Sequence, residues 1–125
     1  MVKINFDRAV FSGENKSGIG VVIRDNLGFV IASCSKKLRQ AYNSSKVEAL
    51  AAAMALSFAA NIGINKAILE GDSLEFIKAL SEYDTTLSSI GPWIEYAKIY
   101  SNNFFQLLYS QEIVIMLLIS WPDMR

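Results

Sequence analysis

The sequence predicts a single α/β domain built on a mixed β-sheet. Three observations support this fold class: apolar and polar residues alternate over residues 2–11, the apolar spacing becomes helical after residue 45, and a short apolar run follows at residues 67–70. The chain has 125 residues, of which 52% are apolar, so it is large enough for one domain with a real core. We expect residues 1–112 to form that domain and residues 113–125 to be an aberrant apolar tail.

The first 40 residues predict an antiparallel meander of three strands. The strands are expected at residues 2–11, 19–24 and 29–34. Turn-forming residues separate them at residues 12–18 and 25–28, and Gly28 suits the positive φ of a bulged hairpin. Short turns of this kind join antiparallel neighbours.

A helix is predicted at residues 45–62. Its apolar stripe consists of Val47, Leu50, Met54, Phe58 and Ile62, with alanines on the flank. Ser45 and Glu48 have the spacing of a capping box at the start of the helix, and Gly63 is a suitable C-terminal stop.

The second half of the chain predicts strands that extend the sheet. Residues 67–70 form a short apolar strand, and a strand that follows a crossover helix is expected to lie parallel to the strand before it. An amphipathic helix follows, with Leu74, Ile77 and Leu80 on its apolar face. A third helix is expected from Pro92 to about residue 101 with Glu95 and Lys98 exposed, and a fifth strand at residues 104–109.

Composition excludes several function classes. The 12 basic and 12 acidic residues cancel, so no overall positive field marks a dedicated nucleic-acid binder. Cys34 is the only cysteine and the chain has no histidine, which excludes disulfides, zinc ligand sets and His-based triads. The apolar run at residues 113–119 is far shorter than the ~20 residues of a membrane span, and residue 1 leads straight into a strand without a signal-peptide pattern. We therefore expect a soluble intracellular protein without a membrane partner.

Asp7, Glu48 and Asp72 are the candidate functional residues. Asp7 lies inside the first strand, where burial of a carboxylate is costly, so we expect it to be exposed at a sheet rim, paired or bound to a cation. Glu48 lies in the first turn of the long helix, and Asp72 follows the fourth strand, at the end where open α/β sheets bind ligands. Each of the last two also has a purely structural interpretation, since Glu48 can close the capping box and Asp72 can be the N-cap of the second helix.

Four segments together resemble the ribonuclease H type-1 domain, and most closely its plant reverse-transcriptase-like branch. They are residues 4–9 (INFDRA), 18–25 (GIGVVIRD), 47–52 (VEALAA) and 69–73 (LEGDS). The resemblance covers residues 2–109. It implies a five-stranded mixed sheet of order 3-2-1-4-5 flanked by helices, and Mg²⁺-dependent hydrolysis of the RNA strand of RNA–DNA hybrids.

The resemblance also assigns site residues. It implies that the catalytic and metal-binding carboxylates are Asp7, Glu48 and Asp72. These would hold Mg²⁺, or alternatively Mn²⁺, as hard cations with oxygen ligands, in a two-metal site that needs no small-molecule cofactor. The segment before the long helix would contact the minor groove of the hybrid through Asn43, Ser44 and Ser45, whose polar groups suit recognition of the 2′-OH.

Two departures from the family pattern weaken the prediction of activity. Arg8 stands where the family has glycine, so it is expected to crowd the cleft or, alternatively, to contact phosphate. Strand alternation is expected to turn it to the face opposite Asp7, which would make it a mild defect. Residues 113–125 replace a helix of the pattern Arg-x-x-Asn-x-x-Ala-His-x-Leu-Ala, whose His completes the family's site. Read one base earlier, the junctions of this tail can encode that pattern, so we interpret it as the product of a shifted reading frame.

The sequence leaves more than one function open. The first is a ribonuclease H-like enzyme that cleaves RNA–DNA hybrids. The alternative is a catalytically impaired nucleic-acid-binding or interaction module on the same fold, or a transposon-derived or frameshifted remnant.

Overall fold

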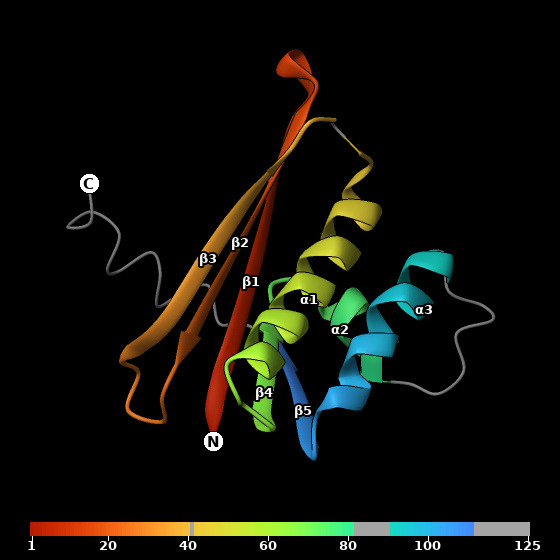
Figure 1. Ribbon diagram of the computed structural model, residues 1–125. Coiled ribbons are helices and arrows are strands. Elements are labelled where there is room, and N and C mark those ends of the chain that lie inside the picture. The colour runs from red at the N-terminus through yellow and green to blue at the C-terminus, as the bar shows by residue number, and fades with distance from the viewer. Residues whose placement is uncertain (41, 82–90, 112–125) are drawn as a thin grey trace.

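The computed structural model describes residues 1–40, 42–81 and 91–111, which form one mixed sheet with helices on one side (Figure 1). The strands are β1 (Val2–Phe11), β2 (Lys16–Arg24), β3 (Val30–Leu38), β4 (Lys66–Gly71) and β5 (Gln106–Gln111). The helices are α1 (Ser44–Asn61), α2 (Leu74–Ser81) and α3 (Gly91–Ile99), with the short 3-10 turns η1 (Ser12–Glu14) and η2 (Tyr100–Asn103). The strand order β3-β2-β1-β4-β5 confirms the predicted fold class. The tail at residues 113–125, with its predicted aberrant character, lies outside the described residues.

The β1–β2–β3 meander is antiparallel, as predicted. Its second turn is held by Asp25, whose Oδ1 accepts the backbone N–H groups of Leu27 and Phe29 at 2.9 and 3.0 Å. Gly28 adopts a φ of +92° there, a conformation that glycine reaches without steric cost. β3 continues beyond its predicted end because its basic segment, Lys36 to Leu38, pairs with the start of β2.

The second half of the chain adds parallel strands to the meander. β4 pairs in parallel with β1, with Asn5 opposite Glu70, and β5 pairs in parallel with β4. α1 is the crossover that makes the first parallel pairing possible, as the sequence predicted. β5 begins at Gln106, two residues later than expected, because Phe105 and Gln106 first donate their N–H groups to the carbonyl of Asn65.

The start of α1 differs from the predicted capping box. The N-cap is Asn43, whose side chain accepts the N–H of Lys46 at 2.8 Å. The cap residue is therefore two positions earlier than the predicted cap, Ser45. Glu48 is five residues after Asn43, whereas a capping box needs a residue three positions after the cap. Its C-terminal end follows the prediction, because Gly63 has a φ of +92° and donates to the carbonyl of Ala60.

Alanines, rather than the predicted large apolar stripe, form the buried face of α1. The helix lies between the β1–β2 part of the sheet and α3, so it is packed on two sides. Its fully or nearly fully buried alanines are Ala49, Ala51, Ala52, Ala53, Ala55 and Ala59. Of the predicted stripe only Val47 is fully buried, and Ile62 is 48% exposed. Small side chains allow both neighbours to approach the helix closely.

α2 packs its apolar side against the sheet with a small change in the residues involved. Ile77 and Leu80 are buried as predicted, but Leu74 is half-exposed and Phe76 is buried in its place. The Phe76 ring packs edge-on against Phe6 of β1, with ring centroids 6.1 Å apart. Among the described helices, none is both long and apolar enough to cross a bilayer.

Candidate functional site

Asp7 and Asp72 follow the same residue pair on the neighbouring elements β1 and β4. Asn5 of β1 is opposite Glu70 of β4 in the parallel pair, and each aspartate comes two residues after its member of that pair. Asp72 directly follows the last residue of β4, at the carboxyl end of the strand. The topology therefore brings two of the predicted acids to one edge of the sheet.

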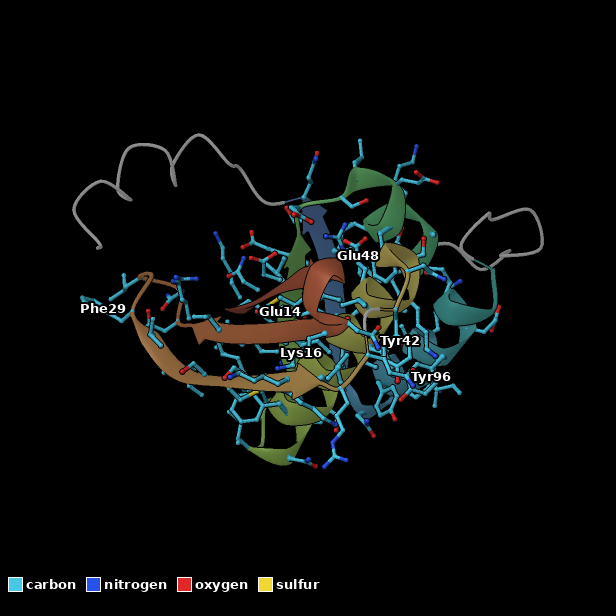
Figure 2. All side chains as sticks on the ribbon, turned by 90° about the horizontal axis from the view of Figure 1, so that it is seen from above. Glu14, Lys16, Phe29, Tyr42, Glu48 and Tyr96 are labelled. Carbon is cyan, nitrogen blue, oxygen red and sulfur yellow. The ribbon has the colours of Figure 1, made fainter. Side chains whose placement is uncertain are left out.

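Glu48 joins these acids from α1, which packs on β1. Glu48 is 6% exposed, and Figure 2 shows it near the middle of one end of the molecule. Burial raises the pKa of the Glu48 carboxyl from its ordinary value of 4.5 to about 7. Arg8 opposes this rise, whereas the negative charges of Asp72, Asp7 and Glu75 add to it.

Glu75 is an acid that the sequence prediction missed. It lies in the first turn of α2, three residues after Asp72, and its charge acts on Glu48. The signal was present in the sequence, since residues three apart share a helix face at the start of α2. We call Asp7, Glu48, Asp72 and Glu75 the carboxylate cluster.

The structural interpretations of the predicted acids are wrong. Ser73, not Asp72, caps α2, because the Ser73 hydroxyl accepts the N–H of Phe76 at 3.2 Å. The Asp72 backbone carbonyl instead accepts a hydrogen bond from Gln111 of β5. Glu48 closes no capping box, since Asn43 caps α1. Neither carboxylate is used as a helix cap.

Arg8 contacts the carboxylate cluster directly. Alternation along β1 leaves Asp7 exposed and turns Arg8 to the helix side, so the two do lie on opposite faces as predicted. The helix side is also where Glu48 lies, so Arg8 is next to a predicted site residue, and the prediction that it is a mild defect stays a prediction. Arg8 Nε is 3.7 Å from Glu48 Oε1, and the Arg8 backbone N–H donates to Asp7 Oδ1 at 2.8 Å.

The carboxylates of the cluster are chemically suitable ligands for a hard divalent cation, but they lie too far apart to hold one. Carboxylate oxygens are the ligands that Mg²⁺ prefers. Within the described ranges, however, no three Asp, Glu, His or Cys side chains come close enough together to hold a metal ion. The arrangement with Arg8 against Glu48 therefore does not fit a bound metal.

The predicted hybrid-binding segment lies at the start of α1, one helical turn before Glu48. Asn43 is exposed and is the N-cap, Ser44 is the first residue of the helix, and Ser45 is partly buried. The preceding loop is anchored to β2, because the buried hydroxyl of Ser17 donates to the carbonyl of Gln40 at 2.7 Å. This segment thus has a defined position beside the carboxylate cluster.

A shallow groove runs beside Asp7 over β1, β2 and β3. It encloses about 320 Å³, and its lining includes Asp7, Gly20, Ser35 and Lys37. A side-chain carbon on Gly20 would meet nothing within 4 Å, so the groove exposes backbone at this point. Lys36 and Lys37 give the wall of this groove positive charge.

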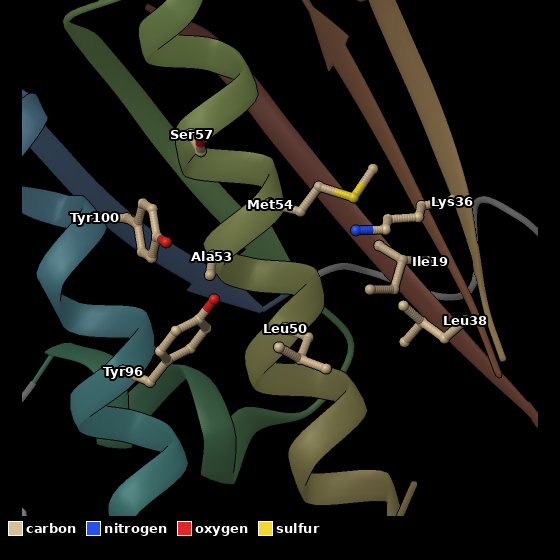
Figure 3. A pocket seen from close by; sticks show the side chains of 9 residues that line it. All are labelled: Ile19, Lys36, Leu38, Leu50, Ala53, Met54, Ser57, Tyr96 and Tyr100. Atoms are coloured by element: carbon tan, nitrogen blue, oxygen red, sulfur yellow. The ribbon is translucent and has the colours of Figure 1, made fainter. Parts of the chain in front are cut away.

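A second pocket, of about 200 Å³, lies along α1, with α3 and η2 on one side and strands β2 and β3 on the other (Figure 3). Tyr96 and Tyr100 line it from α3 and η2, whereas Leu50 and Met54 line it from α1 and Lys36 from β3. None of its lining residues is a carboxylate, histidine or cysteine, so this pocket lacks the side chains that usually bind a metal ion in proteins.

Comparison with known proteins relates this geometry to a family. The model of the family described as "Reverse transcriptase-like" matches residues 5–109. No curated protein sequence matches the chain.

Solved structures of ribonuclease H proteins share the fold. RNase H1 from Halobacterium salinarum NRC-1 superposes with a TM-score of 0.78 at 23% identity, covering 92% of this chain and 87% of its own. The RNase H domain of rv2228c from Mycobacterium tuberculosis gives 0.74 at 18% identity, with coverages of 89% and 81%. LC11-RNase H1, solved in complex with an RNA/DNA hybrid, gives 0.67 at 18% identity, with coverages of 90% and 85%.

Proposed function

Because this chain belongs to the reverse transcriptase-like family and has the ribonuclease H fold, we propose that it is a nucleic-acid-binding domain that recognises RNA–DNA hybrids. The structural relative LC11-RNase H1 was solved with such a hybrid, and a foamy-virus protease-reverse transcriptase was solved with double-stranded DNA. RNA–DNA hybrids form during nucleic-acid metabolism inside cells, so the proposal implies an intracellular protein.

The observation that carries this proposal is the convergence of acids from three elements at one end of the sheet. Asp7 comes from β1, Glu48 from α1 and Asp72 from the residue after β4, and the charges of both aspartates act on Glu48. A buried acid among like charges destabilises the fold unless a cation compensates it. Retaining such a group is typical of a site that works on a charged substrate.

The hybrid would lie across the groove beside Asp7 and the start of α1. Exposed cations at the end of β3 and directly after it, Lys36, Lys37 and Arg39, can neutralise phosphates. Asn43, Ser44 and Ser45 would provide the polar groups that distinguish the 2′-OH of RNA. Phosphate contacts position the duplex, whereas contacts to the sugar provide the selectivity.

Hydrolysis at this site would require Asp7, Glu48 and Asp72 to gather around Mg²⁺ or Mn²⁺. Such ions would supply positive charge to the transition state of phosphodiester hydrolysis. The chain's own contribution would be to align the hybrid through its basic β3 segment and the start of α1.

A second function is a hybrid-binding module with little or no hydrolytic activity. The contact of Arg8 with Glu48, 3.7 Å between Nε and Oε1, favours it, because a guanidinium already balances part of the charge that a metal ion would neutralise. Both functions share the binding step and differ in cleavage.

The experiment that separates them measures binding and cleavage together. Fluorescence anisotropy should show tighter binding to an RNA–DNA hybrid than to a DNA duplex of the same sequence at one fixed salt concentration. Cleavage in Mg²⁺ or Mn²⁺ that Asp7→Asn abolishes supports the enzyme, and binding without cleavage supports the module. Asp25→Asn is the matched control, since its remaining side-chain oxygen can still accept the turn N–H groups. Equal affinity for hybrid and DNA duplex would contradict the proposal.

A further inference from the structure

The Arg8 side chain lies against the most buried acid of the carboxylate cluster. Its Nε is 3.7 Å from Glu48 Oε1, in a pair whose side chains are 29% and 8% exposed, respectively. Arg8 is the neighbour whose charge lowers the pKa of Glu48, while the other three acids of the cluster raise it. The guanidinium therefore compensates negative charge at the point where the cluster is least solvated.

This ion pair is held by charge more than by fitted hydrogen bonds. Arg8 Nε is buried and has no hydrogen-bond acceptor among the described residues. A charge-assisted hydrogen bond between nitrogen and oxygen is typically about 2.7–2.9 Å long, so the contact to Glu48 is an ion pair without that bond. A buried ion pair without such hydrogen bonds recovers less of the free energy that its desolvation costs, so less is lost when its partners separate.

The direction of the Arg8 side chain follows from the alternation of side chains along β1. Ile4 and Phe6 are buried against the helices, so the residue two positions after Phe6 points the same way. Glycine at this position would leave open space next to Glu48, whereas the arginine side chain occupies it with a permanent positive charge.

We propose that Arg8 is a built-in cation of the carboxylate cluster and competes with a divalent metal ion for Glu48. This inference rests on the proposed function, because it assumes that the cluster is the site for such an ion. While Arg8 contacts Glu48, the domain can bind a hybrid but has a low affinity for the metal ion. Metal binding requires the guanidinium to leave Glu48.

Binding of Mn²⁺ to the full chain tests this directly, without any activity measurement. The free Mn²⁺ signal in electron paramagnetic resonance gives the affinity of the wild type, Arg8→Gln and Arg8→Gly. We expect both variants to bind Mn²⁺ at least about tenfold more tightly, because a nearby positive charge has been removed. Adding Glu48→Gln to Arg8→Gln should return the affinity to the weak wild-type level.

Arg24→Gln is the matched control. Arg24 also lies in the sheet, but its Nη1 donates to Asn5 Oδ1 at 3.2 Å and its charge is not among those that act on Glu48. Its loss should leave the Mn²⁺ affinity unchanged. Arg8→Gln keeps a long polar side chain, so it provides the test even where Arg8→Gly does not fold.

Two outcomes overturn the inference: wild-type Mn²⁺ affinity in Arg8→Gln, or an equal gain in Arg24→Gln. Hybrid binding measured in EDTA separates this failure from that of the proposed function. Binding of the hybrid with unchanged Mn²⁺ affinity overturns the role of Arg8 alone. Tighter Mn²⁺ binding in a protein that binds no hybrid supports the role of Arg8 and contradicts hybrid recognition.

Discussion

Gly71 and Phe6 lie so close together that a side-chain carbon on Gly71 would be 2.7 Å from Cζ of the Phe6 ring. The ring cannot easily move away, because it packs edge-on against Phe76. Ile77 Cδ1 would also be 3.2 Å from the added carbon. Gly71 is thus required by the packing between β4, β1 and α2, directly before Asp72.

Gly71→Ala should therefore destabilise the domain by about 1–3 kcal/mol, the usual cost of forcing an extra carbon into a packed core. Urea denaturation monitored by circular dichroism measures the change. Gly20→Ala is the matched control, because a carbon there would meet nothing within 4 Å. Its effect should be within about 0.5 kcal/mol of zero. Equal stability of the two variants would contradict the packing described for Gly71.

The sheet could be predicted from the sequence because its signals are local. β1 has the predicted bounds, since alternation over ten residues is a strong strand signal. Gly28 and Gly63 both adopt the positive φ expected of them. The order of the strands required more than local pattern, and it came from the resemblance to the ribonuclease H type-1 domain.

The cap and the buried face of α1 could not be predicted because tertiary structure decides between equivalent local choices. Asn43 and Ser45 are both good N-cap residues, and only the extended backbone of Asn43, with ψ of 156°, selects it. The apolar stripe on one side of α1 was visible, but the packing of α3 on the other side was not. Close packing on two sides favours alanine over the larger residues.

The contact between Arg8 and Glu48 was missed although the sequence contained its signal. Ile4 and Phe6 are apolar, so their parity identifies the side of β1 that faces the helices, and Arg8 shares that parity. The prediction placed Asp7 with Glu48 and took the position of Arg8 opposite Asp7 to make it a mild defect. Assigning the strand face from its apolar residues first would have placed the arginine beside Glu48.

Glu48→Gln should stabilise the domain at high pH. The folded state raises the pKa of Glu48 from 4.5 to about 7, so it binds this proton more tightly than the unfolded chain does. Stability is consequently lost as the pH rises from 4.5 through 7, when the buried carboxyl must ionise. In EDTA at pH 8, the free energy of unfolding of Glu48→Gln should exceed that of the wild type by about 1–3 kcal/mol.

The difference between these two proteins should almost disappear near pH 4, where Glu48 is protonated in the folded state. Urea denaturation at pH 4, 6 and 8 measures this dependence. Glu14→Gln is the control, because it makes the same chemical change at an exposed position in η1. A Glu48→Gln difference that does not grow with pH would show that burial does not penalise this carboxylate.

The gene should contain the codons that a shifted reading frame requires after residue 111. Read one base earlier, the junction of Trp121 and Pro122 must encode Ala, and that of Leu118 and Ile119 encodes His only where the Leu118 codon ends in C. The junction of Val114 and Ile115 encodes Asn only where the Val114 codon ends in A. Genomic sequencing of this region tests these two codons. Other third bases would rule out the reading-frame interpretation of the tail.

Asn43 has a structural and a proposed binding role that substitution can separate. Asn43→Ala removes the acceptor for the N–H of Lys46 and should destabilise the domain by about 0.5–2 kcal/mol. Asn43→Ser keeps a capping oxygen and should stay close to wild-type stability, yet it lacks the amide proposed to contact the hybrid. We expect Asn43→Ser to weaken hybrid binding by about 0.5–1.5 kcal/mol in fluorescence anisotropy, the net value of one hydrogen bond.

The control for this separation is Asn103→Ser, which removes an exposed amide whose Nδ2 donates to the carbonyl of Tyr100 in η2. η2 leads into the start of β5, whereas Gln111, which contacts Asp72, is the last residue of that strand. Asn103 therefore lies at the far end of β5 from Asp72, and hybrid binding should be unchanged. DNA duplex binding by Asn43→Ser should also change less than hybrid binding, because the lost contact is proposed to read the 2′-OH. Equal losses for hybrid and DNA duplex would mean that Asn43 contributes to phosphate binding or helix stability and does not recognise RNA.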